Sequence, residues 1–130
     1  SKKVLDDLNG RALALIDDVG LSSFVHETAV ELPYGRKRAL EIATTLALDP
    51  ELLVLDEPFE GLAPAVVLEL FRVFDELRKH VSIVIVEHNL DLVLALADRV
   101  FVLERGAVHH QGPAKPLLDD LEYRKKILWL

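Results

Sequence analysis

The sequence predicts an α/β fold, and three of its features support that prediction. Two short apolar runs, LLVLD at residues 52–56 and SIVIV at 82–86, have the length and β-branched content of buried strands. The segment between them has helical periodicity, and strand, helix and strand at this spacing favour a βαβ unit with parallel strands. Further helical segments lie on both sides of this unit, in a chain of 130 residues that is long enough for one domain.

The first third of the chain is predicted to be helical. A helix is expected over residues 3–19, with Gly20 suited to its C-terminal cap. A polar connection leads to Pro33, and a second helix is expected from about 35 to 48, ending at Asp49-Pro50. The apolar residues of the first helix recur at helical spacing and form one stripe, made of Val4, Leu8, Ala12, Leu15 and Val19.

The rest of the chain contains the two strands, which as continuous apolar runs are expected to be covered on both faces. Pro64 opens the connecting helix, and Asn89 is suited to cap a short helix after the second strand. A hairpin is expected around Arg105-Gly106, followed by one amphipathic helix. The expected elements are helices at 64–79, 90–97 and 114–128, and hairpin strands at 99–104 and 107–111.

Composition excludes several classes of protein. The net charge of −7 argues against general binding to nucleic acid or to an anionic membrane surface. The chain has no cysteine, which rules out a disulfide framework and a thiolate zinc site. No apolar run approaches the roughly 18 residues that a membrane-spanning helix needs. His109 and His110 are interpreted as part of an exposed hairpin rather than as metal ligands.

The second helix begins with an unusual concentration of positive charge. Arg36, Lys37 and Arg38 occupy its first turn, where the helix dipole favours acidic side chains. Such a terminus binds anions, and cations would strengthen that property once an anion is present. Arg36 is the expected contact, whereas Lys37 is expected to pair with Glu41 at i+4 on the helix surface.

Acidic residues follow the two predicted strands. Asp56 and Glu57 end the first strand, and Glu87 and His88 follow the second. Parallel strands bring their carboxyl ends to one edge, where open α/β sheets bind ligands. Asp56 could hold a divalent cation, Glu57 could orient or deprotonate a water molecule, and His88 could contact developing charge. Solvated charges at strand ends are an equally open interpretation of these residues.

Four motifs in order resemble those of ATP-binding cassette (ABC) ATPases. LLVLDEP followed by GLAP is similar to the Walker B strand and D-loop of that family, and IVIVEHNLDLVLALADRVFVLERGAV is similar to its H-loop strand and following hairpin. LPYGRKRALEIATTLALDP resembles the signature motif and its helix, in the variant of branched-chain amino-acid and urea importers. The resemblance covers nearly the whole chain.

The resemblance implies a role for each matching residue. Asp56 matches the aspartate that holds Mg²⁺, through water, and Glu57 matches the glutamate that polarises the attacking water. His88 matches the switch histidine at the γ-phosphate. The D-loop, which crosses to the partner subunit, corresponds to Glu60, Gly61 and Leu62. The signature segment, which contacts ATP bound to the opposite subunit, corresponds to Leu32, Pro33, Tyr34, Gly35 and Arg36.

The sequence also departs from the family pattern. Pro33, Tyr34 and Arg36 replace the serine, first glycine and glutamine of the usual signature, so phosphate contact would rely on backbone amides and Arg36. None of the glycines precedes a Lys-Ser or Lys-Thr pair, so these residues contain no phosphate-binding Walker A loop, and the Q-loop is absent as well. The resemblance therefore implies the C-terminal half of a nucleotide-binding domain, unable by itself to bind ATP tightly or to hydrolyse it.

The resemblance further implies an organisation, partners and a location. Residues 1–49 would form the helical subdomain that carries the signature motif, and 50–130 the C-terminal part of a P-loop-NTPase-like, RecA-type core. The complete domain would use ATP and Mg²⁺ in a head-to-tail dimer with a second ATPase subunit. That dimer would drive a membrane permease from the cytoplasmic side of the bacterial inner membrane.

Two other functions remain open from the sequence. One is a small metal-dependent hydrolase that uses Asp56, Glu57, Glu87 and His88 without a Walker A loop. The other is a non-catalytic module that pairs with another polypeptide, self-associates or swaps segments through an uncovered sheet edge and apolar surface. Trp129, near the C-terminus, is expected to pack back on the domain or to contact a partner.

Overall fold

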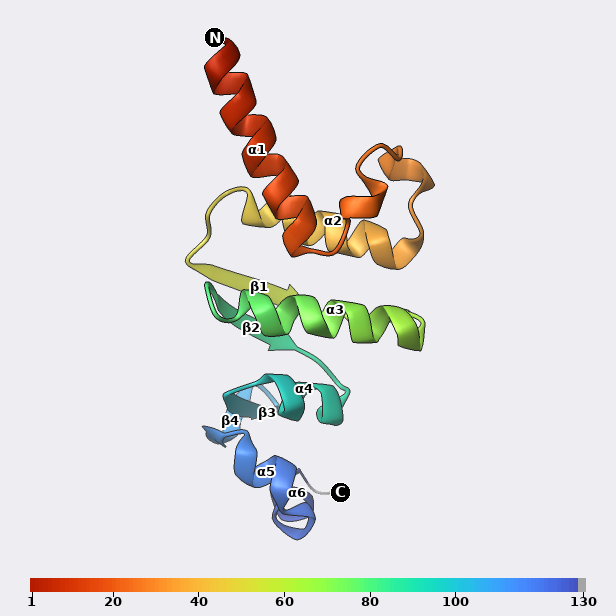
Figure 1. Ribbon diagram of the computed structural model, residues 1–130. Coiled ribbons are helices and arrows are strands. Elements are labelled where there is room, and N and C mark those ends of the chain that lie inside the picture. The colour runs from red at the N-terminus through yellow and green to blue at the C-terminus, as the bar shows by residue number, and fades with distance from the viewer. Residues whose placement is uncertain (129–130) are drawn as a thin grey trace. The chain divides into compact units, whose positions relative to one another are not determined.

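The computed structural model describes residues 1–128, so Trp129 lies outside the described residues. These residues divide into two compact units, the first covering residues 1–86 and the second beginning at Glu87, and each is described here by itself. Figure 1 shows the order of the elements. The α-helices are α1 (Lys2–Asp18), α2 (Tyr34–Leu46), α3 (Pro64–Leu77), α4 (Leu90–Leu96), α5 (Lys115–Asp119) and α6 (Leu121–Leu128). The 3₁₀ turns are η1 (Ser22–Phe24) and η2 (Ala29–Glu31), and the strands are β1 (Leu52–Asp56), β2 (Ser82–Val86), β3 (Arg99–Glu104) and β4 (Ala107–Pro113).

The first unit contains the predicted βαβ arrangement. β1 and β2 have the bounds that the apolar runs predict, and they pair in parallel, with Val54 opposite Val84. α3 connects them and runs along the pair in Figure 1. The α/β character, the parallel pairing and the connecting helix are therefore confirmed.

The prediction that both faces of this sheet are covered is wrong for the described residues. Leu53 points to the interior and is buried, but the alternate side chains along each strand face outward. The exposed apolar residues of that face are Leu52, Val54, Val84 and Val86, each at least 47% exposed. The helices of the first unit cover only one side of this two-stranded sheet. A continuous apolar run is typical of a strand that is covered on both sides, which is why the sequence predicted a second layer.

α1 is capped as predicted but is mostly uncovered. Gly20 follows the helix with a φ of +73°, and its N–H donates to the carbonyl of Asp17 at 2.9 Å. The N–H of Leu21 donates to the carbonyl of Ile16 at 2.9 Å, which completes a Schellman motif. Of the predicted apolar stripe only Val19 is buried, and Val4 is 54% exposed, because just the C-terminal part of α1 meets α2 and η1.

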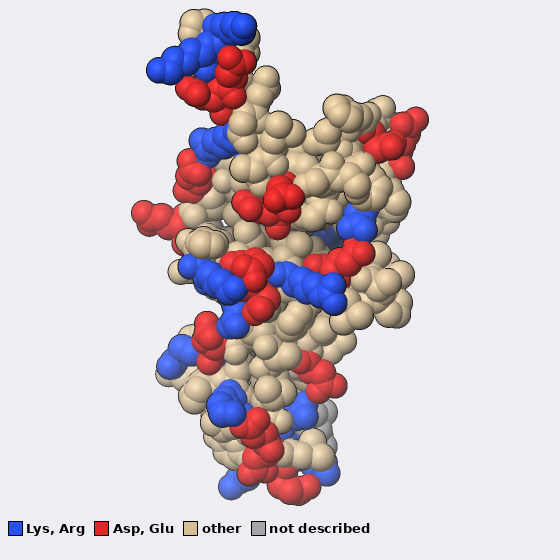
Figure 2. Space-filling view, in the orientation of Figure 1, with Lys and Arg blue, Asp and Glu red and all other residues tan. Residues whose placement is uncertain are grey.

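α3 joins the segment after β1 to the core. Its buried residues are Leu70, Phe74 and Leu77, of which Phe74 is completely buried. At its C-terminal end, Asp75 and Glu76 pair with Arg78 and Lys79, which directly follow the helix, each at 2.8 Å. Positive and negative side chains alternate over this helix in Figure 2. The helix is therefore amphipathic, as its sequence predicts.

The second unit contains the predicted hairpin and a divided C-terminal helix. β3 and β4 are antiparallel around Arg105 and Gly106, both with positive φ, and Asn89 accepts a hydrogen bond from the N–H of Leu92 at 3.3 Å as the predicted cap of α4. The single helix expected over 114–128 is wrong. Asp120 adopts an extended conformation, and its carboxylate accepts from the N–H of Tyr123 at 2.9 Å, so it ends α5 and caps α6. Leu94, Ala114 and Leu117 form the main core cluster of this unit.

Within residues 1–128, no helix has both the length and the apolar character that crossing a bilayer requires.

Candidate functional site

The carboxyl end of β1 presents two acidic residues. Asp56 is the last residue of the strand and is exposed, and Glu57 follows it and is half-buried. The N–H of Glu57 donates to the carbonyl of Val86 at 2.8 Å, so hydrogen bonding to β2 continues past the strand itself. The sheet thereby fixes the backbone that carries both carboxylates.

Glu57 has an unusual backbone conformation. Its φ is +47°, in the left-handed region that residues other than glycine rarely enter. Such a conformation costs on the order of 1–3 kcal/mol and is found preferentially at functional sites. The turn carries the chain away from the strand immediately after Asp56, and its strain is consistent with a functional role for this residue.

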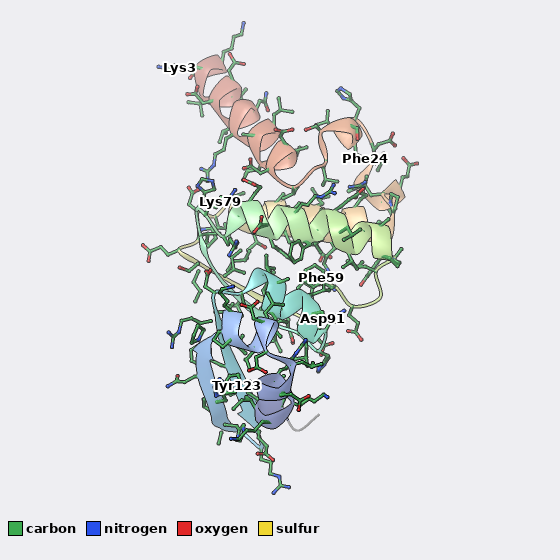
Figure 3. The ribbon with its side chains drawn as sticks, turned by 60° about the horizontal axis from the view of Figure 1, so that its bottom comes forward. Lys3, Phe24, Phe59, Lys79, Asp91 and Tyr123 are labelled. Atoms are coloured by element: carbon green, nitrogen blue, oxygen red, sulfur yellow. The ribbon has the colours of Figure 1, made fainter. Side chains whose placement is uncertain are left out.

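The segment that resembles a D-loop is anchored to α3. The N–H of Glu60 donates to the carbonyl of Glu57 at 3.1 Å, and Gly61 has a φ of +69°. Phe59 is buried, and its ring packs edge-on against Phe74 with the ring centres 5.5 Å apart. Phe59, labelled in Figure 3, therefore links this loop to the core.

Asp56 also lines a pocket between α2 and β1. The polar residues around it include Arg38, Glu41 and Thr45 of α2, and the apolar residues include Val54 of β1. Arg38 donates to the carboxylate of Glu41 at 3.1 Å. The pocket thus places the carboxylate of Asp56 and the guanidinium of Arg38, which is paired with Glu41, along one lining.

The residues of the signature-like segment form the entry to α2. Leu32 is buried, Tyr34 is 59% exposed, and Pro33 is the N-cap residue. The carbonyl of Pro33 accepts from the N–H groups of Arg36 at 2.9 Å and Lys37 at 3.0 Å. The first N–H groups of a helix have no acceptor within it, so this terminus retains donors for an anion.

The positive charge at this terminus has partners that the sequence did not reveal. Arg36 forms a 2.6 Å ion pair with Glu69 of α3, and its guanidinium carbon lies 5.2 Å from the centre of the Phe24 ring. The expected Lys37–Glu41 pair is wrong, because Glu41 pairs with Arg38 instead. A side chain at i+3 reaches Glu41 equally well on a helix surface.

Gly35 allows the close approach of α2 to α3. A Cβ atom at this position would overlap the side chain of Val66, and Gly35 is buried. Sequence reasoning placed this glycine in the signature segment that contacts ATP and missed its packing role. Val66 lies one turn before Glu69, so the same side of α3 contacts both Gly35 and Arg36 of the signature-like segment.

Replacing Gly35 by alanine should therefore destabilise the chain by about 1–3 kcal/mol, since the new methyl group overpacks the α2–α3 contact. Gly10, in the middle of α1, provides the matched control because a Cβ atom added there would meet no other atom within 4 Å. Gly10→Ala should stabilise by up to about 1 kcal/mol through helix propensity. Urea unfolding of both variants checks this, and equal signs would contradict the packing role.

Glu87 and His88 begin the second unit. The carboxylate of Glu87 accepts from the N–H of His88 at 3.0 Å and of Asn89 at 3.5 Å, so it supports the turn that leads into α4. The predicted meeting of His88 with Asp56 and Glu57 involves both units and stays a prediction. Among residues 1–128, no three His, Cys, Asp or Glu side chains gather as a metal-binding group. The metal-dependent hydrolase thus gains no support.

Known proteins provide the remaining comparison. No family model matches this chain. Over 111 residues, or 84% of it, the chain is 40% identical to the energy-coupling factor transporter ATP-binding protein EcfA2 of Streptococcus sanguinis. The chain is a homologue of ABC transporter ATP-binding proteins. It is also 39% identical over 98 residues to the high-affinity branched-chain amino acid transport ATP-binding protein LivG of Escherichia coli.

Solved ABC structures share the fold of this homologue. The likeness to cbiO1 of Clostridium perfringens, part of the ABC transporter complex cbiONQ, has a TM-score of 0.82 at 30% identity and covers 95% of this chain and 50% of that one. The ADP conformation of MJ1267, an ATP-binding cassette of an ABC transporter, gives 0.75 at 30% identity over 92% of this chain and 49% of that one. The chain spans about two fifths of the curated relatives, 40% of EcfA2 and 38% of LivG.

Proposed function

We propose that this chain supplies the Walker B, D-loop, signature and switch-histidine segments of an ABC transporter ATPase. In this function Asp56 holds Mg²⁺ through water, Glu57 polarises the attacking water and His88 contacts the γ-phosphate. The D-loop residues Glu60, Gly61 and Leu62 and the signature residues contact a second subunit and its ATP. The signature residues are Leu32, Pro33, Tyr34, Gly35 and Arg36.

One observation carries this proposal. The two acidic residues Asp56 and Glu57 lie at the carboxyl end of a parallel strand, in a fold that matches solved ATP-binding cassettes. Ligands of open α/β sheets bind at that edge. The positive φ of Glu57 and the anchoring of the following loop by Phe59 support a role for this edge beyond folding.

The complete system would import a small polar solute, with branched-chain amino acids the first candidate because LivG is among the relatives. Its partners would be a second ATPase subunit and a membrane permease, on the cytoplasmic side of the bacterial inner membrane. Residues 1–49 would act as the helical subdomain and 50–130 as part of the ATPase core. The 130 residues alone contain no Walker A sequence and are proposed to lack tight ATP binding and turnover.

A joined protein tests the proposed catalysis. Residues 1–130 are fused to the half of Clostridium perfringens cbiO1 that has no counterpart in this chain, and circular dichroism checks that the product folds. ATP-dependent phosphate release by the joined protein would support the proposal. A folded product that binds ATP without hydrolysing it would contradict the catalytic roles. Micromolar ATP binding to the 130 residues alone, measured by calorimetry, would contradict their proposed inactivity.

The uncovered sheet face makes self-association of the isolated chain a further expectation. Val54 is 62% exposed on that face, and apolar surface of this kind favours association. Val54→Lys should lower the apparent mass at high concentration, measured by light scattering. Leu68→Lys, which changes an equally exposed residue of α3, is the control and should have a smaller effect. A wild-type monomer at high concentration would contradict this expectation.

A further inference from the structure

Arg36 of α2 is held on two sides by other elements of the first unit. Its Nη1 atom lies 2.6 Å from Oε2 of Glu69 on α3, and its guanidinium carbon lies 5.2 Å from the centre of the Phe24 ring in η1. The Arg36 side chain is only 25% exposed, whereas that of Glu69 is 45% exposed. A guanidinium between a carboxylate and an aromatic face is well satisfied without any ligand.

This ion pair differs from the others at the same helix terminus. Arg38 pairs with Glu41 inside its own helix, at 3.1 Å. Among the ion pairs of residues 1–128, the one between Arg36 and Glu69 links α2 to α3. The contact of Gly35 with Val66, one turn before Glu69, holds the two helices together at this point. Glu69 therefore lies one turn along α3 from the position at which this helix packs against Gly35 of α2.

We infer that Glu69 competes with phosphate for Arg36 and thereby lowers the affinity of the signature segment for phosphate. This inference rests on the proposed function, in which the N-terminus of α2 meets the γ-phosphate. An anion there attracts the guanidinium of Arg36, which lies in the first turn of the helix and whose Nη1 atom is paired with Oε2 of Glu69. The Glu69 carboxylate and the phosphate thus compete for the guanidinium of Arg36, and phosphate binding breaks the ion pair between α2 and α3.

The competition has a direct test in the isolated chain. The ¹⁵N-labelled chain is titrated with inorganic tripolyphosphate, and the amide signals of Tyr34 and Gly35 report binding. Glu69→Gln keeps the shape of the side chain and removes its charge, so it should tighten binding by about threefold to fivefold, the range set by a partly exposed ion pair. Circular dichroism confirms that each variant is folded.

Two further variants separate competition from a general effect of charge. Glu41→Gln removes the same charge from α2 and releases Arg38, and it should change the affinity by less than about twofold. In the background Arg36→Gln, the gain from Glu69→Gln should disappear. Equal gains from Glu69→Gln and Glu41→Gln would overturn the inference, and so would a gain that persists without Arg36.

The remaining outcomes also decide the question. No binding by the wild type or by Glu69→Gln would overturn the inference, and weaker binding by Glu69→Gln would show that the carboxylate positions Arg36 instead of competing. The proposed ATPase activity is tested independently of this inference, because it is measured as phosphate release by the joined protein.

Discussion

Glu57→Gln in the joined protein should lower ATP hydrolysis by about 10²–10⁴-fold while leaving ATP affinity nearly unchanged. A positioned carboxylate that accepts a proton from the attacking water contributes this much to a rate, and an amide of the same shape cannot accept that proton. Glu57 is half-buried at the end of β1, and its N–H is bound to the carbonyl of Val86. Glutamine therefore keeps the backbone in place and tests the chemistry alone.

The measurement is the rate of phosphate release together with ATP affinity from calorimetry. Glu51→Gln is the matched control, since Glu51 is exposed and precedes the opposite end of the same strand. It should retain hydrolysis within about twofold. If Glu57→Gln hydrolyses ATP as fast as Glu51→Gln, the assignment of Glu57 is wrong, whatever the fold.

Phe74→Ala should destabilise the chain by about 3–5 kcal/mol, the cost of deleting a completely buried aromatic ring from a core. The loss would remove a large part of the roughly 5–15 kcal/mol by which small domains are stable. It also removes the edge-on partner of Phe59, at 5.5 Å between ring centres, and so loosens the segment that resembles the D-loop.

Urea unfolding measures the loss of stability, and hydrogen exchange of the Glu60, Gly61 and Leu62 amides measures the loosening. Phe101→Ala removes an identical ring that is 58% exposed in the second unit, and it should cost far less. Equal costs for the two variants, or unchanged exchange in the 60–62 amides of Phe74→Ala, would show that Phe74 does not anchor this loop.

The sequence by itself determined the local structure of this protein. The bounds of β1 and β2, the caps at Gly20 and Asn89, and the hairpin around Gly106 depend on residues close together in the chain, so local preference predicts them. The single C-terminal helix failed for a local reason as well. The Asp120 side chain caps α6 and thereby competes with continuation of a single helix. The spacing of apolar residues does not predict such a cap.

The features of the candidate site also fall into those that the local sequence predicts and those that only the tertiary structure shows. Asp56 and Glu57 were identifiable from the sequence because their position follows directly from the end of a strand. Only the tertiary structure decided that Arg36 meets Glu69 and Phe24, and that Gly35 contacts Val66, since these partners come from separate elements. It likewise decided that one face of the β1–β2 sheet is open, because coverage depends on which layers are present and not on the strand's own residues.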